Sequence, residues 1–144
     1  MDKNKLNRLI AKVEKPARYM GGELNMRIKA EAEFRFALCF PDTYEIGMSH
    51  LGSRIIYNIL NKRADTYCER VYVPWVDMEE QLRENNEPIF SLETRSPLRE
   101  FNVIGFSLLY EMCYTNILTV LELSGIPFLA SERGEDMPLI AAGG

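Results

Sequence analysis

The chain has 144 residues, 47% of them hydrophobic and 26% charged, so it is long enough to bury one core without crosslinks. Its net charge of −4 is uneven: residues 1–35 carry nine Lys and Arg against five Asp and Glu, and residues 36–144 carry eight against sixteen. The acidic body argues against nucleic acid as a general partner, and no apolar stretch reaches membrane-spanning length, so we expect no membrane partner.

The N-terminal segment predicts a helix and a connector. Residues 4–15 place their apolar side chains on one helical face, and Pro16 ends the pattern. Residues 17–25 follow as a turn-rich connector. We therefore expect an N-terminal extension at 1–32 and an α/β domain at 33–144.

The start of this domain predicts a strand, a loop and a helix. Residues 34–40 are apolar and aromatic, as is typical of a strand, and Pro41 closes them. Residues 41–52 predict a loop. Apolar residues then repeat at helical spacing from Leu51, with Ser49 or Ser53 as the expected cap.

The remaining elements alternate in type. Residues 89–94 could form a short extra strand or an extended connector. The other expected elements are a strand at 69–75, a helix at 77–85 with Asp77 as N-cap, a strand at 102–110, a helix at 114–124 and a strand at 138–144. This order predicts a Rossmann-like, flavodoxin-like α/β fold with a parallel sheet and helices on both faces.

Ligands of such sheets bind beyond the carboxyl ends of the strands, where four loops are expected, at 41–52, 74–77, 107–113 and 143–144. These loops contain three short patterns: D-x-Y-x-x-G from Asp42 to Gly47, S-x-L from Ser107 to Leu109, and a glycine pair. From the residues alone, the glycines of the first loop could cradle a ligand or only permit tight turns and close helix–strand packing.

Together the three patterns resemble the signature of cobalamin-binding domains. The resemblance implies that the first loop lies under the corrin and that the serine and the glycine pair line a slot for the nucleotide tail. Tyr44 stands where that family has its cobalt-ligating His. A phenol with a pKa near ~10 is a poor cobalt ligand at neutral pH, so a corrinoid would bind without an axial ligand from the protein.

The longer phrases FPDTYEIGMSHLG, VPWVDMEE, FSLETRSPL, IGFSLLYEMCYTNIL and GEDMPLIAAGG, with KPARYMGGE at 15–23, resemble the N-terminal region of a family of large radical SAM proteins. That family implies a B12-binding-like leading domain, followed by a core whose C-x-x-x-C-x-x-C motif holds a [4Fe–4S] cluster that acts on S-adenosylmethionine. Cys39, Cys68 and Cys113 do not form this motif. We therefore expect a non-catalytic fragment of a radical SAM enzyme, with the downstream radical SAM domain as its partner, and a homo-oligomer is a further option.

Widely spaced, unpaired cysteines also predict a reducing, cytoplasmic location. No catalytic or metal-binding residue is expected in this chain. His50 could be a replacement axial ligand or a capped or solvent-facing side chain at the start of a helix, and Trp75 could line a pocket or pack in the core or at an interface. The expected cofactor-binding residues are Asp42, Thr43, Tyr44, Gly47, Met48, Ser107, Leu109, Glu111, Gly143 and Gly144.

Two other functions remain open at this stage. The domain could have kept the fold and lost the cofactor, and so serve as a docking or dimerisation surface; a site plugged by Tyr44, Met48 and Leu109 would favour this. A flavin or nucleotide could also bind at the same edge, although residues 41–52 offer only two spaced glycines and no phosphate-binding motif.

Overall fold

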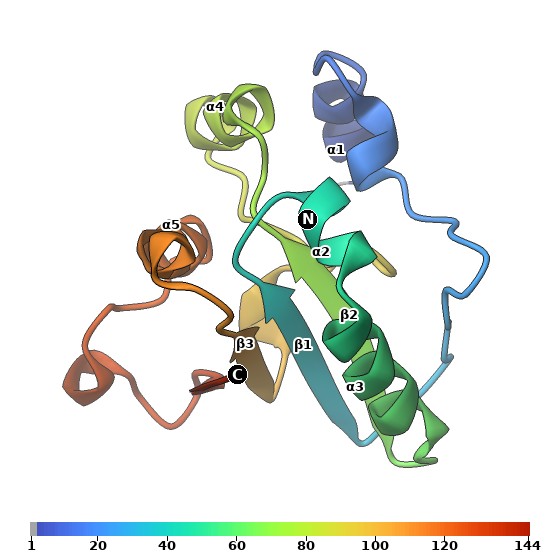
Figure 1. Cartoon of the computed structure of the whole chain (residues 1–144). Coiled ribbons are helices and arrows are strands. Elements are labelled where there is room, and N and C mark those ends of the chain that lie inside the picture. The colour runs from blue at the N-terminus through green and yellow to red at the C-terminus, as the bar shows by residue number, and fades with distance from the viewer. Residues whose placement is uncertain (1–2) are drawn as a thin grey trace.

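The central sheet has four strands that all run parallel, as expected from the alternating pattern. The computed structural model describes residues 3–144 (Figure 1). The strands lie in the order β2-β1-β3-β4. Their bounds are β1 Phe34–Phe40, β2 Thr66–Tyr72, β3 Val103–Ser107 and β4 Leu139–Gly143. This arrangement confirms the Rossmann-like, flavodoxin-like fold class.

Helices cover both faces of the sheet, but not equally (Figure 1). One face carries α2 (Tyr44–Ser49) and α3 (Leu51–Lys62), and the other carries α4 (Val76–Asn85) and α5 (Tyr114–Leu123). Short 3-10 turns complete the connections, at η1 Pro16–Tyr19, η2 Leu98–Glu100, η3 Glu111–Cys113 and η4 Ala130–Glu132. Because α3 lies over β1 and β2, the same face of β3 and β4 is open.

The main core lies on the α4 and α5 face. Ala37, Val71 and Ile104 from three strands are buried there against Met78 and Val120 from the two helices. The α3 face has a much smaller core of Leu38, Tyr57 and Cys68, with Phe36 and Leu60 packed against it. The unequal cores leave room for a cavity on the α3 face.

The N-terminal helix α1 (Lys3–Ile10) ends five residues before the expected end. It packs on α4, and Leu6 is buried in the main core. Val13 is buried as well, although it lies beyond the helix. The apolar spacing therefore identified the buried side chains correctly but not the end of the helix.

Two helix starts differ from the expectation. Residues 41–52 contain α2 rather than an unbroken loop, and His50, not a serine, caps α3 through its side chain. Asp77 is not the N-cap of α4, because Trp75 occupies that position. The Asp77 carboxylate instead accepts the amides of Met78 and Glu14, both at 2.7 Å.

The segment at 89–94 lies beside the outer edge of β2. Leu92 donates its amide to the carbonyl of Arg70 at 2.8 Å, and Phe90 forms an isolated bridge with Pro97. The segment is thus an extended connector that covers part of an edge strand. β2 also begins at Thr66, three residues earlier than expected.

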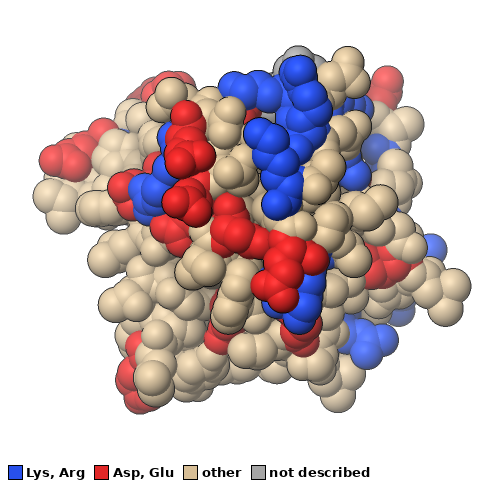
Figure 2. Space-filling model, turned by 90° about the horizontal axis from the view of Figure 1, so that it is seen from above, with Lys and Arg blue, Asp and Glu red and all other residues tan. Residues whose placement is uncertain are grey.

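The surface seen from above carries charges of both signs side by side (Figure 2). Lys and Arg side chains gather in one area of this face, and Asp and Glu side chains lie directly next to them. Within residues 3–144, no helix is both long enough and apolar enough to cross a bilayer.

Candidate functional site

An open cavity of about 480 Å³ lies on the uncovered face of the sheet, at the carboxyl ends of its strands. We call this cavity the slot. Its walls come from β1, β3, β4 and the beginning of α3, and none of its lining residues carries a charged side chain. The residues used below are Phe36, His50, Gly52, Ser107, Leu109 and Gly143.

Small residues form the floor of the slot. Gly105 of β3 lies in register between Leu38 of β1 and Ala141 of β4. A Cβ on Gly105 would be 2.5 Å from Cζ of Phe36, so the glycine makes space for that ring. A Cβ on Gly143 would meet nothing within 4 Å. The floor is therefore low at Gly143 of β4, where a ligand could lie close to the backbone, whereas the Phe36 ring covers Gly105 of β3.

Ser107 provides a hydrogen-bonding group in this apolar setting. It ends β3, is in register with Gly143, and only 8% of its surface is exposed. Its hydroxyl has no hydrogen-bond partner within residues 3–144, although it lines the slot. The hydroxyl oxygen is not sealed from solvent, so it is available to a ligand that enters the slot.

His50 borders the slot from the helix side. Its Nδ1 accepts the amide of Ser53 at 3.1 Å and lies 2.9 Å from the Ser53 hydroxyl. These contacts replace the missing helical partner of the Ser53 amide. The ring packs against Phe40, with the ring centroids 5.2 Å apart, and its Cε1 would be 2.8 Å from a Cβ on Gly52. His50 is therefore held over the start of α3.

The structure brings together four of the ten residues expected at the site. Ser107, Leu109, Gly143 and Gly144 all line the slot. These four come from two strand ends that are far apart in the chain, and parallel pairing of β3 with β4 places them side by side. The other six expected residues lie outside the slot.

Asp42 joins two of the strand-end loops. Its carboxylate accepts the amide of Thr43 at 2.7 Å and also accepts the hydroxyl of Tyr110. The hydrogen bond to Asp42 raises the pKa of Tyr110 to about 12. The neighbouring carboxylate of Glu45 pairs with Arg18 at 2.8 Å.

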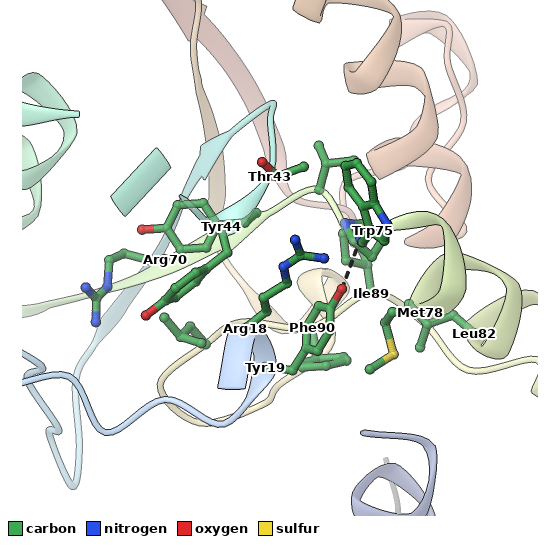
Figure 3. A pocket seen from close by; sticks show the side chains of 14 residues that line it. Arg18, Tyr19, Thr43, Tyr44, Arg70, Trp75, Met78, Leu82, Ile89 and Phe90 are labelled. Atoms are coloured by element: carbon green, nitrogen blue, oxygen red, sulfur yellow. Dashed lines mark hydrogen bonds between the residues drawn. The ribbon is translucent and has the colours of Figure 1, made fainter. Parts of the chain in front are cut away.

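Tyr44 points away from the slot. Its ring packs edge-on against Tyr72 at 5.6 Å, and its hydroxyl donates to Glu23 at 2.9 Å. Burial, together with the bond to Glu23, raises the pKa of Tyr44 to about 12. Thr43 and Tyr44 border a second cavity, near Arg18 and Trp75, with a volume of only about 20 Å³ (Figure 3). That volume suffices for roughly one water molecule.

The remaining expected residues have packing or surface positions. A Cβ on Gly47 would be 2.3 Å from the ring of Tyr72, so the glycine lets α2 lie close to the sheet. The sulfur of Met48 accepts hydrogen bonds from Tyr72 at 3.0 Å and Arg70 at 3.3 Å. Glu111 is exposed on η3.

Sequence reasoning missed a buried ionic group next to Tyr44. The Arg70 side chain is 5% exposed and contacts Glu93 at 2.6 Å and Glu23 at 3.2 Å. Its guanidinium also lies 4.7 Å from the ring centre of Tyr57. The signal in the sequence is the Glu69–Arg70 pair inside an otherwise apolar strand. A charged pair in such a position needs buried partners.

No group of three or more His, Cys, Asp or Glu residues suited to a metal ion occurs within residues 3–144. Cys39, Cys68 and Cys113 are all buried as free thiols, and burial raises the pKa of Cys39 and Cys68.

Comparison with known proteins gives one match. A protein-family model described as radical SAM proteins, N-terminal, matches residues 52–144, which is more than half of the chain. The matched region runs from the first turn of α3 through β4 and contains most of the slot lining, although not Phe36, Leu38 or His50. No curated protein and no solved structure matches the chain.

Proposed function

We propose a function from the premise that this chain belongs to the radical SAM protein family, as an N-terminal region of that family. In our proposal, the domain binds a corrinoid in the slot. It positions this corrinoid, or a substrate, against a following domain that holds a [4Fe–4S] cluster and S-adenosylmethionine. The chain itself then acts as a binding and positioning domain, and the reaction belongs to the parent protein.

The observation that carries the proposal is the slot with its Ser107 hydroxyl, which makes no hydrogen bond within residues 3–144 and faces the cavity. A corrinoid has a nucleotide tail with a flat aromatic base. An apolar, uncharged slot with a glycine floor accommodates such a base, and one hydroxyl donor can bind a polar atom of the tail. The residues that would hold the tail are Ser107, Leu109, Gly143 and Gly144. The slot therefore fits this part of the corrinoid.

The protein side chains do not fit the role of lower cobalt ligand. The Tyr44 hydroxyl is engaged with Glu23 and lies outside the slot. Its raised pKa keeps the phenol neutral at physiological pH, and a neutral phenol is a poor metal ligand. The proposal is thus a corrinoid bound without an axial ligand from the protein. When bound, a corrinoid supplies cobalt-centred redox or group-transfer chemistry.

A titration with hydroxocobalamin tests the proposal, with Gly143→Val and Ala142→Val as matched variants. Side chains alternate along β4, so valine at 143 enters the slot, whereas valine at 142 points to the opposite face. Equilibrium dialysis should show saturable binding to the wild type and to Ala142→Val. Gly143→Val should bind at least about tenfold more weakly, a loss of roughly 1.4 kcal/mol. Equal affinities of all three proteins for hydroxocobalamin would show that it binds outside the slot.

A second candidate function is a docking surface without a cofactor, and the outer side of α3 favours it. Leu51, Ile55 and Ile59 repeat every four residues on α3 and are 66%, 49% and 57% exposed. Contiguous apolar surface of this kind is typical of interaction sites. No binding of hydroxocobalamin by the wild type would favour this function. Flavin or nucleotide binding has less support, because no Lys or Arg lines the slot to bind phosphate.

A further inference from the structure

The slot has a second polar group besides Ser107, and the cofactor-family resemblance does not assign it a role. His50 is the only histidine in the chain and lies half-buried at the wall of the slot. Within the described residues 3–144, only one of its two ring nitrogens makes a hydrogen bond, namely Nδ1 with Ser53. The other nitrogen, Nε2, is available for a ligand.

The contacts of Nδ1 determine what Nε2 can do. A ring nitrogen that accepts an amide N–H carries no hydrogen, so the neutral ring must carry its hydrogen on Nε2. In this tautomer Nε2–H is a hydrogen-bond donor and has no free lone pair for a metal. The cap of α3 thus makes His50 a donor instead of a cobalt ligand.

The position of the ring brings this donor to the slot. Phe40 supports one side of the ring at 5.2 Å between centroids. The Cε1–Nε2 edge lies over Gly52, where a Cβ would be 2.8 Å from Cε1 and 3.3 Å from Nε2. Gly52 itself lines the slot. Because Gly52 has no side chain, it does not stand between the Cε1–Nε2 edge of the His50 ring and the cavity.

We infer that His50 is a ligand-contacting residue of the slot, which donates from Nε2–H to an acceptor atom of the bound molecule while its Nδ1 caps α3. The inference rests on the proposed function, because it assigns the ligand to the same slot. Two neutral donors, Ser107 and His50, in a cavity without charged side chains select a ligand portion that is flat, uncharged and bears acceptor atoms. An aromatic base with ring nitrogens or ribose oxygens has this chemistry.

Substitutions of His50 can separate its two roles. Asparagine is among the best helix N-caps, so His50→Asn keeps an acceptor for the Ser53 amide but removes the Nε2–H donor. His50→Ala removes both. We expect His50→Asn to retain the thermal midpoint of the wild type and to bind hydroxocobalamin about three- to tenfold more weakly, as is usual for one lost neutral hydrogen bond. His50→Ala should lose thermal stability as well as affinity.

Long-range proton–nitrogen NMR spectra of the wild type supply an independent readout, and a single histidine makes the assignment unambiguous. We expect the Nε2–H tautomer in the free protein and a shift of the Nε2 resonance on addition of hydroxocobalamin. The Nδ1–H tautomer would overturn the inference. So would wild-type binding that leaves the ring resonances and the His50→Asn affinity unchanged, although the proposed function would then stand. A wild type that does not bind hydroxocobalamin would refute both.

Discussion

At the scale of single residues, glycines and hydroxyl groups have different roles in the slot and in the region around Tyr44. Gly143 leaves open space above β4, whereas Gly47 is in close contact with the ring of Tyr72. Ser107 has no hydrogen-bond partner in the described chain, whereas the Tyr44 hydroxyl is engaged with Glu23. The slot is thus the part of the edge with free space and a free polar group, and the Tyr44 region is packed.

The close packing at Gly47 predicts that a substitution there lowers the stability of the fold without changing binding in the slot. In Gly47→Ala, the new methyl group would be 2.3 Å from the Tyr72 ring, so helix α2 or the ring must move. We expect a loss of about 1–3 kcal/mol in the free energy of unfolding, measured by urea denaturation. Gly143→Ala is the control, because its methyl group meets nothing, and it should change stability by less than about 0.5 kcal/mol. Similar losses in both variants would contradict this account.

The buried ionic group around Arg70 predicts a larger loss of stability. Arg70→Met leaves the carboxylates of Glu93 and Glu23 without their cation in a buried site. We expect a loss of about 3–5 kcal/mol in the free energy of unfolding. Arg63→Met is the matched control, since Arg63 and Asp65 form a solvent-exposed pair that contributes little to stability. If the two arginine variants were equally stable, Arg70 would not be needed to hold this region together.

At the scale of elements, α3 has both a structural side and an exposed side. Tyr57 is 1% exposed, and its hydroxyl accepts the amide of Arg27 at 2.8 Å. On the opposite side, Ile55 and Ile59 are about half exposed. The isoleucines repeat at helical spacing, yet the helix buries Tyr57 on β1 and β2 instead. A period of 3.6 residues identifies a helix, but it does not tell which apolar side faces the sheet when both sides are apolar.

Substitutions on the two sides of α3 should therefore differ. Ile55→Gln and Ile59→Gln should each change the free energy of unfolding by less than about 0.5 kcal/mol. Tyr57→Ala should cost about 3–5 kcal/mol, because it opens a cavity and removes the partner of the Arg27 amide. Urea denaturation of the three variants gives the comparison. A large loss from either glutamine variant would mean that the exposed side is buried in solution, and sedimentation velocity would then show self-association.

Other elements show what local sequence patterns can predict. The strands and longer helices were predictable because their apolar runs are long and are bounded by Pro41 or Gly125. Helix α2 was not, because six residues with two glycines nearby look like a loop, and contact with Tyr72 and Phe40 decides their conformation. The His50 cap was also missed, because serine and threonine are the usual caps and histidine acts here only through Nδ1.

The candidate site was predictable from the sequence only in part. Ser107, Leu109 and the glycine pair follow strands, and parallel strands bring their carboxyl ends together, so their proximity could be inferred from the sequence. Tyr44 also follows a strand, but its side chain turns toward Glu23 and Arg70. Those partners come from the connector and from β2, and no local pattern specifies such a long-range contact.

At the scale of the whole molecule, the tyrosines predict alkaline unfolding. Burial is the main cause that raises the pKa of Tyr19, Tyr44, Tyr57, Tyr67 and Tyr72, and a hydrogen bond to Asp42 raises that of Tyr110. Unfolded phenols ionise near about pH 10. The stabilisation from these groups is therefore fully present below about pH 10 and is lost as the pH rises toward the folded values.

A pH titration checks this prediction. Phenolate absorbance and far-ultraviolet circular dichroism should change together above about pH 10, because most tyrosines can ionise only when the chain unfolds. The denatured protein in urea serves as the reference and should titrate at the ordinary tyrosine pKa. Complete phenolate formation near that pKa with an unchanged dichroism spectrum would contradict the burial described here.

The most direct test of the central claim is an electron paramagnetic resonance spectrum of cob(II)alamin bound to the full-length protein. If the nucleotide base lies in the slot, and neither Tyr44 nor His50 ligates the metal, the cobalt has no lower nitrogen ligand. We predict saturable binding and a cobalt signal without nitrogen superhyperfine splitting. A bound signal that retains the splitting would contradict the account, since the base would then remain on cobalt or a histidine would replace it. Absence of binding would contradict it as well.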